Sequence, residues 1–235
     1  MPALYAHYRF GARVSRRLDG DLKDIVKKYH AQFVIGLQGP DLFFFYRPWS
    51  LNRVSKYGYR LHSLSAAPFF EHGISVVKEK GRDSGEYAYL LGFLCHFILD
   101  SECHPYVEEM IRETGVQHLE IEEEFEKLLL RMDGKDALDH PLWKLVPHDD
   151  ETAADIVPFY EDMDQDTVKQ SLNDLRMVKK LFHAPGAVKQ DVINTIMKLL
   201  GKYDKMKGLM NQRVDNPKCQ KTNAGLMERF DRTFE

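Results

Sequence analysis

A chain of 235 residues, 43% hydrophobic and 29% charged, is long enough to bury one substantial core. Its formal net charge of −3 argues against a dedicated nucleic-acid-binding protein, which would usually be markedly basic, and gives no electrostatic reason for tight docking on anionic membranes. Three cysteines do not suggest a disulfide framework and fit a reducing compartment.

The N-terminus, MPALYAHYRFGARV, lacks the basic start and apolar stretch of a secretory signal. The longest apolar run, YLLGFLCHFIL, is too short to span a bilayer and is interrupted by His96. We therefore predict a soluble, cytoplasmic protein.

Hydrophobic periodicity is helical nearly throughout, and no stretch alternates convincingly at period two. The pattern predicts helices over residues 3–17 and 20–31. The next stretch, FVIGLQGPDLFFFYRPW, contains glycines and prolines that break helical continuity.

Further helices are predicted over about 65–81 and 83–104. Ser65 and Pro68 indicate the start of the first. The second is expected to end at about His104, because Pro105 disfavours helical geometry in the residue before it.

An acidic helix is predicted over 117–132, with its run of glutamates forming mostly a solvated face. Beyond it come helix-like segments at 155–160, 166–182 and 188–206, then a loop over 208–222 and a short final helix. The prediction is one all-α domain over residues 1–235, in which 150–235 is the helical C-terminal part.

Three ionisable side chains, His96, Asp100 and His104, interrupt the apolar stretch GFLCHFILDSECHPY. Positions four apart on an α-helix differ by only about 40°, so the three side chains line one stripe. Burying such groups without partners is costly. A second pair at the same spacing, His118 and Glu122, lies on the acidic helix.

Histidine and carboxylate side chains on facing helices can build a metal site in a bundle core. One such pair is usually only a satisfied polar pair, but two pairs with a further histidine favour metal binding. The donor set suits zinc, with manganese and iron as competitors. Cys103 lies close to the same stripe, where a small buried hydrophobe is the better interpretation than a ligand.

Other candidate residues carry little signal on their own. His7 is typical of ordinary packing, His62 has no local motif, and Asp41 in QGPDL fits a turn. We interpret the remaining histidines as solvated or structural: His30, His72, His140, His148 and His183.

In order along the chain, however, these residues resemble the zinc-dependent phospholipase C family of bacteria, whose all-α fold is shared with fungal single-strand nucleases. The resemblance covers roughly the first 125 residues. It rests on this ordered set: His7, Asp41, His62, His96, Asp100, His104, His118 and Glu122.

The resemblance implies two or three zinc ions within residues 7–122. The first would be held by Asp41, His62, His96 and Asp100. The second would be held by His104, His118 and Glu122. The third would be held by His7 and a bridging Asp100. In secreted relatives an N-terminal tryptophan completes the third site, whereas this chain begins Met1-Pro2-Ala3. Pro2 could supply an amine after removal of Met1.

By this resemblance the chain is a zinc-dependent phosphoester hydrolase, in which metal-activated water attacks a phosphodiester. Asp41 could ligate, orient the water or act as general base, and we favour ligand and orienter. The partner would be a phosphate-ester small molecule or a phospholipid head group, with no stable nucleic-acid partner. Alternatives are a nuclease or 3′-nucleotidase on the same fold, and a catalytically inactive metal-binding structural protein.

Overall fold

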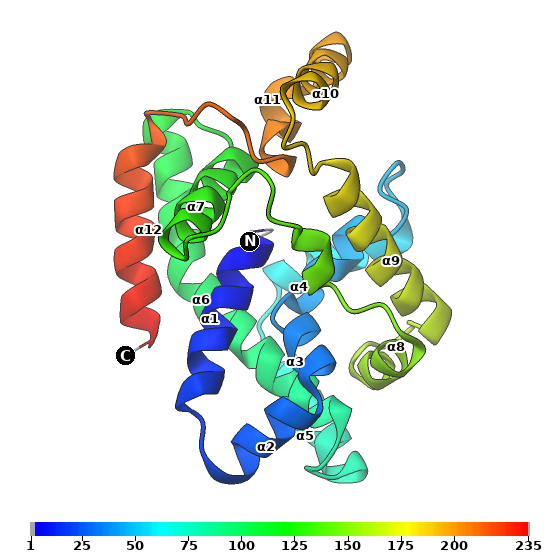
Figure 1. The fold of residues 1–235 in the computed structure, drawn as a ribbon. Coiled ribbons are helices and arrows are strands. Elements are labelled where there is room, and N and C mark those ends of the chain that lie inside the picture. The colour runs from blue at the N-terminus through cyan, green and yellow to red at the C-terminus, as the bar shows by residue number, and fades with distance from the viewer. Residues whose placement is uncertain (1–2, 235) are drawn as a thin grey trace. The chain divides into compact units, whose positions relative to one another are not determined.

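The computed structural model describes residues 3–234, and every regular element in that range is a helix (Figure 1). This confirms the predicted all-α fold class. The α-helices and short 3₁₀ helices (η) follow in chain order: α1 (Leu4–Arg17), α2 (Gly20–Lys28), α3 (His30–Gly36), η1 (Gly39–Phe45), α4 (Arg53–Ser63), α5 (Ala67–Lys80), α6 (Gly85–Thr114), α7 (His118–Met132), η2 (Leu142–Leu145), α8 (Asp150–Ile156), η3 (Val157–Phe159), α9 (Gln165–Leu181), α10 (Ala187–Leu199), α11 (Tyr203–Met206), η4 (Lys207–Leu209) and α12 (Cys219–Phe234).

Several predicted helices are confirmed, notably α1, α5 and α7. The helix predicted over 20–31 is instead broken at Tyr29, whose φ of −108° and ψ of 47° are not helical. Helix α3 then continues to Gly36. Across residues 3–234, each helix is either too short or too polar to cross a lipid bilayer. The cytoplasmic location stays a prediction.

The predicted end of a helix at His104 is wrong, because α6 continues through Pro105 to Thr114. Proline inside a helix costs about 3 kcal/mol through a lost hydrogen bond and a steric clash. Beyond it, however, Val107 and Met110 are buried, and burying such side chains is worth about 1.5–3 kcal/mol each. Tertiary packing therefore outweighs the local preference.

The predicted loop over 208–222 is too long and the final helix is not short. Helix α12 begins at Cys219 and has 16 residues. Its buried residues, Cys219, Thr222, Leu226 and Phe230, lie at intervals of three and four and form one face, which packs against α7. The polar residues between them hid this periodicity.

The chain forms two compact units. Unit 1 comprises residues 1–10, 98–142 and 179–235, and unit 2 comprises residues 11–97 and 143–178. Helix α6 contributes to both, with His96 in unit 2 and Asp100 in unit 1. That the whole chain is a single domain stays a prediction.

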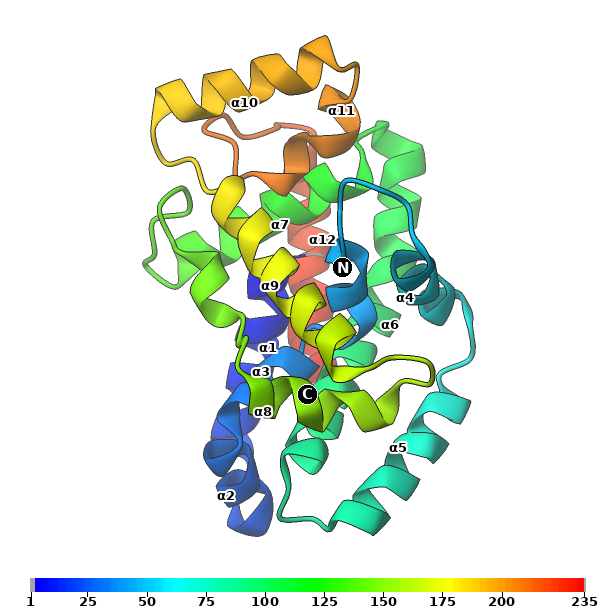
Figure 2. The same cartoon turned by 90° about the vertical axis from the view of Figure 1, so that its right-hand side faces the viewer.

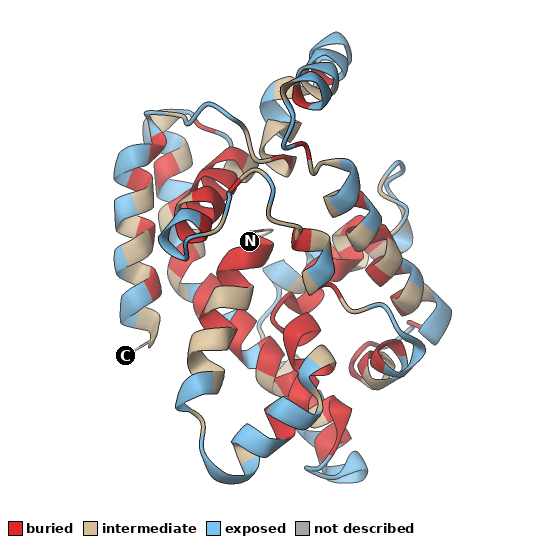
Figure 3. Ribbon diagram, in the orientation of Figure 1, coloured by how far each residue is buried: buried red, intermediate tan, exposed pale blue. Residues whose placement is uncertain are grey.

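Unit 2 contains an unusually close approach of α3 to α6. A Cβ on Gly36 would lie 2.3 Å from the carbonyl oxygen of Tyr89, and a Cβ on Gly92 would lie 2.2 Å from that of Phe33. Only glycine allows the two backbones to touch in this way. The segment that follows α3 is thereby held beside the next turn of α6, which carries His96. Figure 3 shows α3 as almost entirely buried.

Unit 1 is organised around α7, and the prediction that its glutamates are mostly solvated is wrong. Glu120, Glu123, Glu124 and Glu126 are buried along with Glu122. Lys127, on the same helix, lies 3.0 Å from Glu123 and 2.9 Å from Glu124. Other partners come from distant segments: Lys207 pairs with Glu120 at 2.7 Å, the Gln212 N–H donates to Glu123 at 2.7 Å, and the Tyr5 N–H donates to Glu126 at 2.9 Å. Buried carboxylates need such partners, which sequence periodicity does not reveal.

Candidate metal centre

Unit 2 brings together Asp41, His62 and His96 from three elements: η1, α4 and α6. One ligand atom from each lies within 4.8 Å of the others. Asp41 and His96 are buried, and 24% of the His62 side chain is exposed. None of these three residues is adjacent in sequence to another, so the fold alone assembles the cluster.

Gly39 shapes the space that His96 occupies. Its φ is +50°, in the left-handed region that disfavours side chains. A Cβ at this position would also lie 2.3 Å from His96 Cδ2. Gly39 is therefore required both for the turn into η1 and for the position of the His96 ring.

Backbone carbonyl groups determine which nitrogen of each imidazole carries the proton. His62 Nδ1 lies 3.0 Å from the Gly58 carbonyl oxygen, and His96 Nδ1 lies 3.3 Å from that of Leu37. A carbonyl oxygen only accepts hydrogen bonds, so Nδ1 donates in both cases. Metal-binding histidines usually have this arrangement, with the second ring nitrogen held by a carbonyl or carboxylate.

The carboxylate of Asp41 is kept ionised by its neighbours. Burial by itself raises its pKa, but surrounding positive charge, which includes the imidazoles of His62 and His96, lowers it, and the net result lies well below the ordinary value. Burial lowers the pKa of His62, whereas Asp41, 2.8 Å from His62 Nε2, raises it above the ordinary value. His62 therefore holds a second proton on Nε2, facing the carboxylate, in addition to the one on Nδ1.

Unit 1 brings together His104 from α6 with His118 and Glu122 from α7, again with ligand atoms within 4.8 Å of one another. His118 Nε2 lies 2.6 Å from Glu122 Oε1, and His118 Nδ1 lies 3.5 Å from the Glu108 carboxylate. Burial lowers the pKa of His118, but Glu122 raises it above the ordinary value. This cluster repeats the arrangement of the first, with a carboxylate in place of the carbonyl.

A third grouping in unit 1 centres on Asp100. Its Oδ1 lies 3.3 Å from His7 Nε2, and its Oδ2 lies 3.3 Å from His104 Nε2. His7 and Asp100 are buried. One carboxylate thus lies between two imidazoles from different parts of the chain. The Pro2 amine considered in the sequence analysis lies outside the described residues.

These groups fit a divalent metal such as zinc. The donors are imidazole nitrogens and carboxylate oxygens, which zinc prefers. Glu122 is 1% exposed, and its Oε2 has no hydrogen-bond donor among residues 3–234, so a cation would satisfy it. A bound metal would replace the protons on Nε2 of His62 and His118.

Comparison with known families favours a metal site over ordinary buried polar pairs. The sequence matches the family model described as zinc dependent phospholipase C over residues 6–181. The chain belongs to the zinc-dependent phospholipase C family. No curated protein matches the chain significantly, and neither does any solved structure.

In this member of the phospholipase C family, the match continues into α9, well beyond the first 125 residues that carried the resemblance. It includes all eight predicted site residues. Their individual metal-binding roles stay predictions.

The residues considered but set aside are placed elsewhere. Cys103 is fully buried, and burial raises the pKa of its thiol to about 12, so it stays protonated and is a poor ligand. His72 contacts the carbonyl of Pro158 at 2.7 Å, and His183 pairs with Asp139 at 3.2 Å.

Sequence reasoning missed the residues that position the histidines. Gly39 was recognised only as a break in a helix, and Glu108 was not considered. Glu108 lies four residues after His104 on α6, a spacing that would have indicated a neighbour of the cluster. The carbonyls of Leu37 and Gly58 carry no side-chain signal at all.

Proposed function

We propose that this chain is a zinc-dependent phosphoric diester hydrolase of the phospholipase C type. The observation that carries the proposal is the repeated arrangement in which a histidine Nδ1 is held by a carbonyl or carboxylate while Nε2 faces a buried carboxylate. Family membership supports the same reaction class. When bound, zinc lowers the pKa of a coordinated water to about 7 and offsets charge on the phosphoryl oxygens.

The residues would hold two or three ions. Asp41, His62 and His96 would form one set, and His104, His118 and Glu122 a second. His7 with Asp100 would form a third, with Asp100 shared between sets.

Asp41 has a second role in this proposal. Its carboxylate stays ionised and accepts hydrogen bonds only, so it would accept one from the attacking water and orient it. Burial of Asp41 limits competition from bulk solvent. We assign it as ligand and orienting group rather than as the general base.

The direct experiment measures release of a phosphorylated head group. Zinc-loaded protein is incubated with soluble phosphodiesters, including p-nitrophenyl phosphocholine, and with dispersed phospholipids. We expect hydrolysis that a chelator abolishes and zinc restores. Asp41→Asn should lose most activity, whereas Asp83→Asn, whose side chain is 71% exposed, is the matched control and should retain it.

Other outcomes distinguish the alternatives. Cleavage of single-stranded DNA or of 3′-nucleotides, with none of the phospholipids or choline esters, would assign the nuclease activity instead. Tight zinc binding and chelator-induced destabilisation without turnover on any phosphate ester would contradict the proposed enzyme and identify a metal-stabilised protein.

A further inference from the structure

The segment between Asp41 and Glu71 has an unusual charge pattern. It contains four cations, Arg47, Arg53, Lys56 and Arg60, and no carboxylate, although the whole chain is acidic. All four cations are exposed, and they come from α4 and the loop before it. This loop, residues 46–52, joins η1 to α4 (Figure 2).

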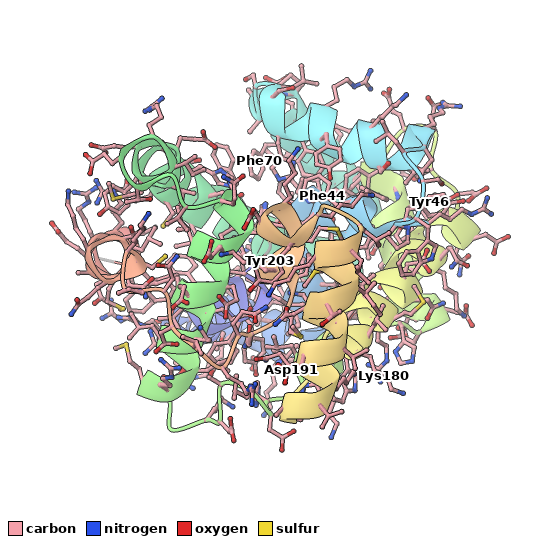
Figure 4. The ribbon with its side chains drawn as sticks, turned by 90° about the horizontal axis from the view of Figure 1, so that it is seen from above. Phe44, Tyr46, Phe70, Lys180, Asp191 and Tyr203 are labelled. Carbon is pink, nitrogen blue, oxygen red and sulfur yellow. The ribbon has the colours of Figure 1, made fainter. Side chains whose placement is uncertain are left out.

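Large apolar side chains are exposed on the same loop. Trp49 and Leu51 are each 71% exposed, among the most exposed large hydrophobic side chains described. Phe44 and Tyr46, which Figure 4 labels, come from η1 and from the residue after it, and both are less exposed. Exposure therefore increases along the loop towards Trp49.

The loop is held in this shape by its own hydrogen bonds. Asn52 Nδ2 donates to the carbonyls of Tyr46 at 2.8 Å and Ser50 at 3.0 Å. The Arg47 N–H donates to the carboxylate of Asp174 at 2.9 Å. These contacts fix the backbone on both sides of Trp49, so its exposure is a property of the folded loop.

A hollow beside the loop is lined by cations. Its lining includes Leu51, Arg53, Lys56, Tyr57, Arg60 and Asp162. Arg53 pairs with Asp162 at 2.7 Å, and the Arg60 guanidinium carbon lies 5.3 Å from the centroid of the Tyr57 ring. Within residues 3–234, no carboxylate lies within ion-pair distance of Lys56 or Arg60.

We propose that residues 46–52 and the basic residues of α4 form a docking surface for an anionic phospholipid membrane. Tryptophan favours the membrane–water interface, because its ring is apolar while its N–H remains hydrated. Exposed cations beside it pair with lipid phosphates and attract anionic lipids. Trp49 and Leu51 enter the head-group region, while Lys56 and Arg60 contact its phosphates.

This surface belongs to the same unit as one candidate metal cluster. Helix α4 carries Arg53, Lys56 and Arg60 and, near its end, His62. Docking would therefore place that cluster close to the lipid. The idea that docking delivers a lipid substrate to the cluster rests on the proposed function. Binding to vesicles, by contrast, requires no turnover.

Fluorescence provides a direct test, because the chain contains only two tryptophans. In the zinc-loaded Trp143→Phe chain, emission comes from Trp49 alone. We expect a blue shift, and quenching by brominated lipid, on vesicles of phosphatidylcholine with phosphatidylserine. Both should weaken with added salt and on phosphatidylcholine alone.

Substitutions locate the surface. Trp49→Ala with Leu51→Ala should reduce co-sedimentation with the anionic vesicles by about tenfold or more. Lys56→Ala and Arg60→Ala should each reduce it by about fivefold. In the comparison variant, serine replaces Val192 and Ile196, which are exposed apolar residues of α10. This variant should bind the anionic vesicles normally. Circular dichroism and the melting temperature confirm that each variant folds.

Several results would overturn the inference. These are an unshifted Trp49 emission on anionic vesicles, loss of binding only in the α10 variant, or self-association through the loop without vesicle binding. Saturable binding of inorganic phosphate with no vesicle binding would show an anion site instead. Vesicle docking without hydrolysis would contradict only the proposed function, and hydrolysis of soluble diesters without docking would contradict only this inference.

Discussion

Replacing Gly39 by alanine tests whether the position of His96 determines metal binding. The new Cβ would lie 2.3 Å from His96 Cδ2, whereas ordinary contacts begin at about 3.4 Å, so the ring must move by about 1 Å. Zinc–nitrogen distances in proteins are reproducible to about 0.2 Å. A displaced His96 therefore no longer ligates, and zinc affinity of this cluster should fall by at least 10–100-fold.

Gly20 provides a matched control. It has the same φ of +50°, but nothing lies within 4 Å of its Cβ position. Alanine at either position carries the left-handed backbone penalty of about 1–2 kcal/mol. Only Gly39→Ala adds the contact with His96. The comparison thus separates loss of backbone freedom from displacement of the ring.

The assay is competition for zinc against a chromophoric chelator, combined with thermal melting of each zinc-loaded variant. We expect Gly20→Ala to melt lower and to bind zinc normally, and Gly39→Ala to melt lower and release zinc readily. Zinc affinity in both variants equal to that of the unaltered chain would refute the assignment of His96 as a ligand. Equal losses in both would show that zinc affinity follows overall stability.

Three further predictions concern other carboxylates. Asp100→Ala should lower zinc content by at least one ion per chain by elemental analysis, because Asp100 lies beside two imidazoles; unchanged content would remove it from the ligands. Glu122→Gln should reduce zinc affinity strongly. Glu108→Gln, which alters an exposed neighbour of His118, should reduce it less, by about 10–100-fold. A larger loss in Glu108→Gln than in Glu122→Gln would contradict the assigned roles. Asp133→Asn should lower the free energy of unfolding near neutral pH by about 1–2 kcal/mol, because Asp133 accepts charged hydrogen bonds from Arg9. The folded pKa of Asp133 is lowered by Arg9 although burial raises it, so this stabilisation is present above the ordinary value of 3.8 and is lost as pH falls through the folded pKa. Denaturant unfolding of the unaltered chain and of Asp133→Asn, repeated across acid pH, measures this stabilisation. A difference in unfolding free energy that does not change with pH would contradict the reasoning.

Spacing along single helices was predictable from the sequence, and so were the candidate residues on α6 and α7. The stripe of His96, Asp100 and His104 follows from helix geometry alone. Asp41 and His62 depended on the family resemblance, because each reaches the cluster through tertiary structure. The role of Gly39 could not be assigned, since a glycine required only by a turn and a glycine that leaves room for a neighbouring ring look the same in sequence.

Errors in the fold had a common physical cause. The continuation of α6 through Pro105 depends on the burial of Val107 and Met110 in the folded core. The burial of the α7 glutamates depends on partners such as Lys207, almost ninety residues later. Local preference describes one element at a time, whereas these outcomes are determined by what packs against it.

The interleaved path of the chain through unit 1 has a consequence for its biosynthesis. Every candidate ligand precedes residue 123, yet α7 is sealed by residues made much later, including Gln212, whose N–H donates to Glu123, and Asn216, whose N–H donates to Glu124. On the ribosome, the candidate ligands of unit 1 therefore emerge before the segments that bury α7. Zinc acquired early would meet an open, exchangeable set of donors. We therefore expect a chain truncated after α9 to release zinc more readily than the full chain.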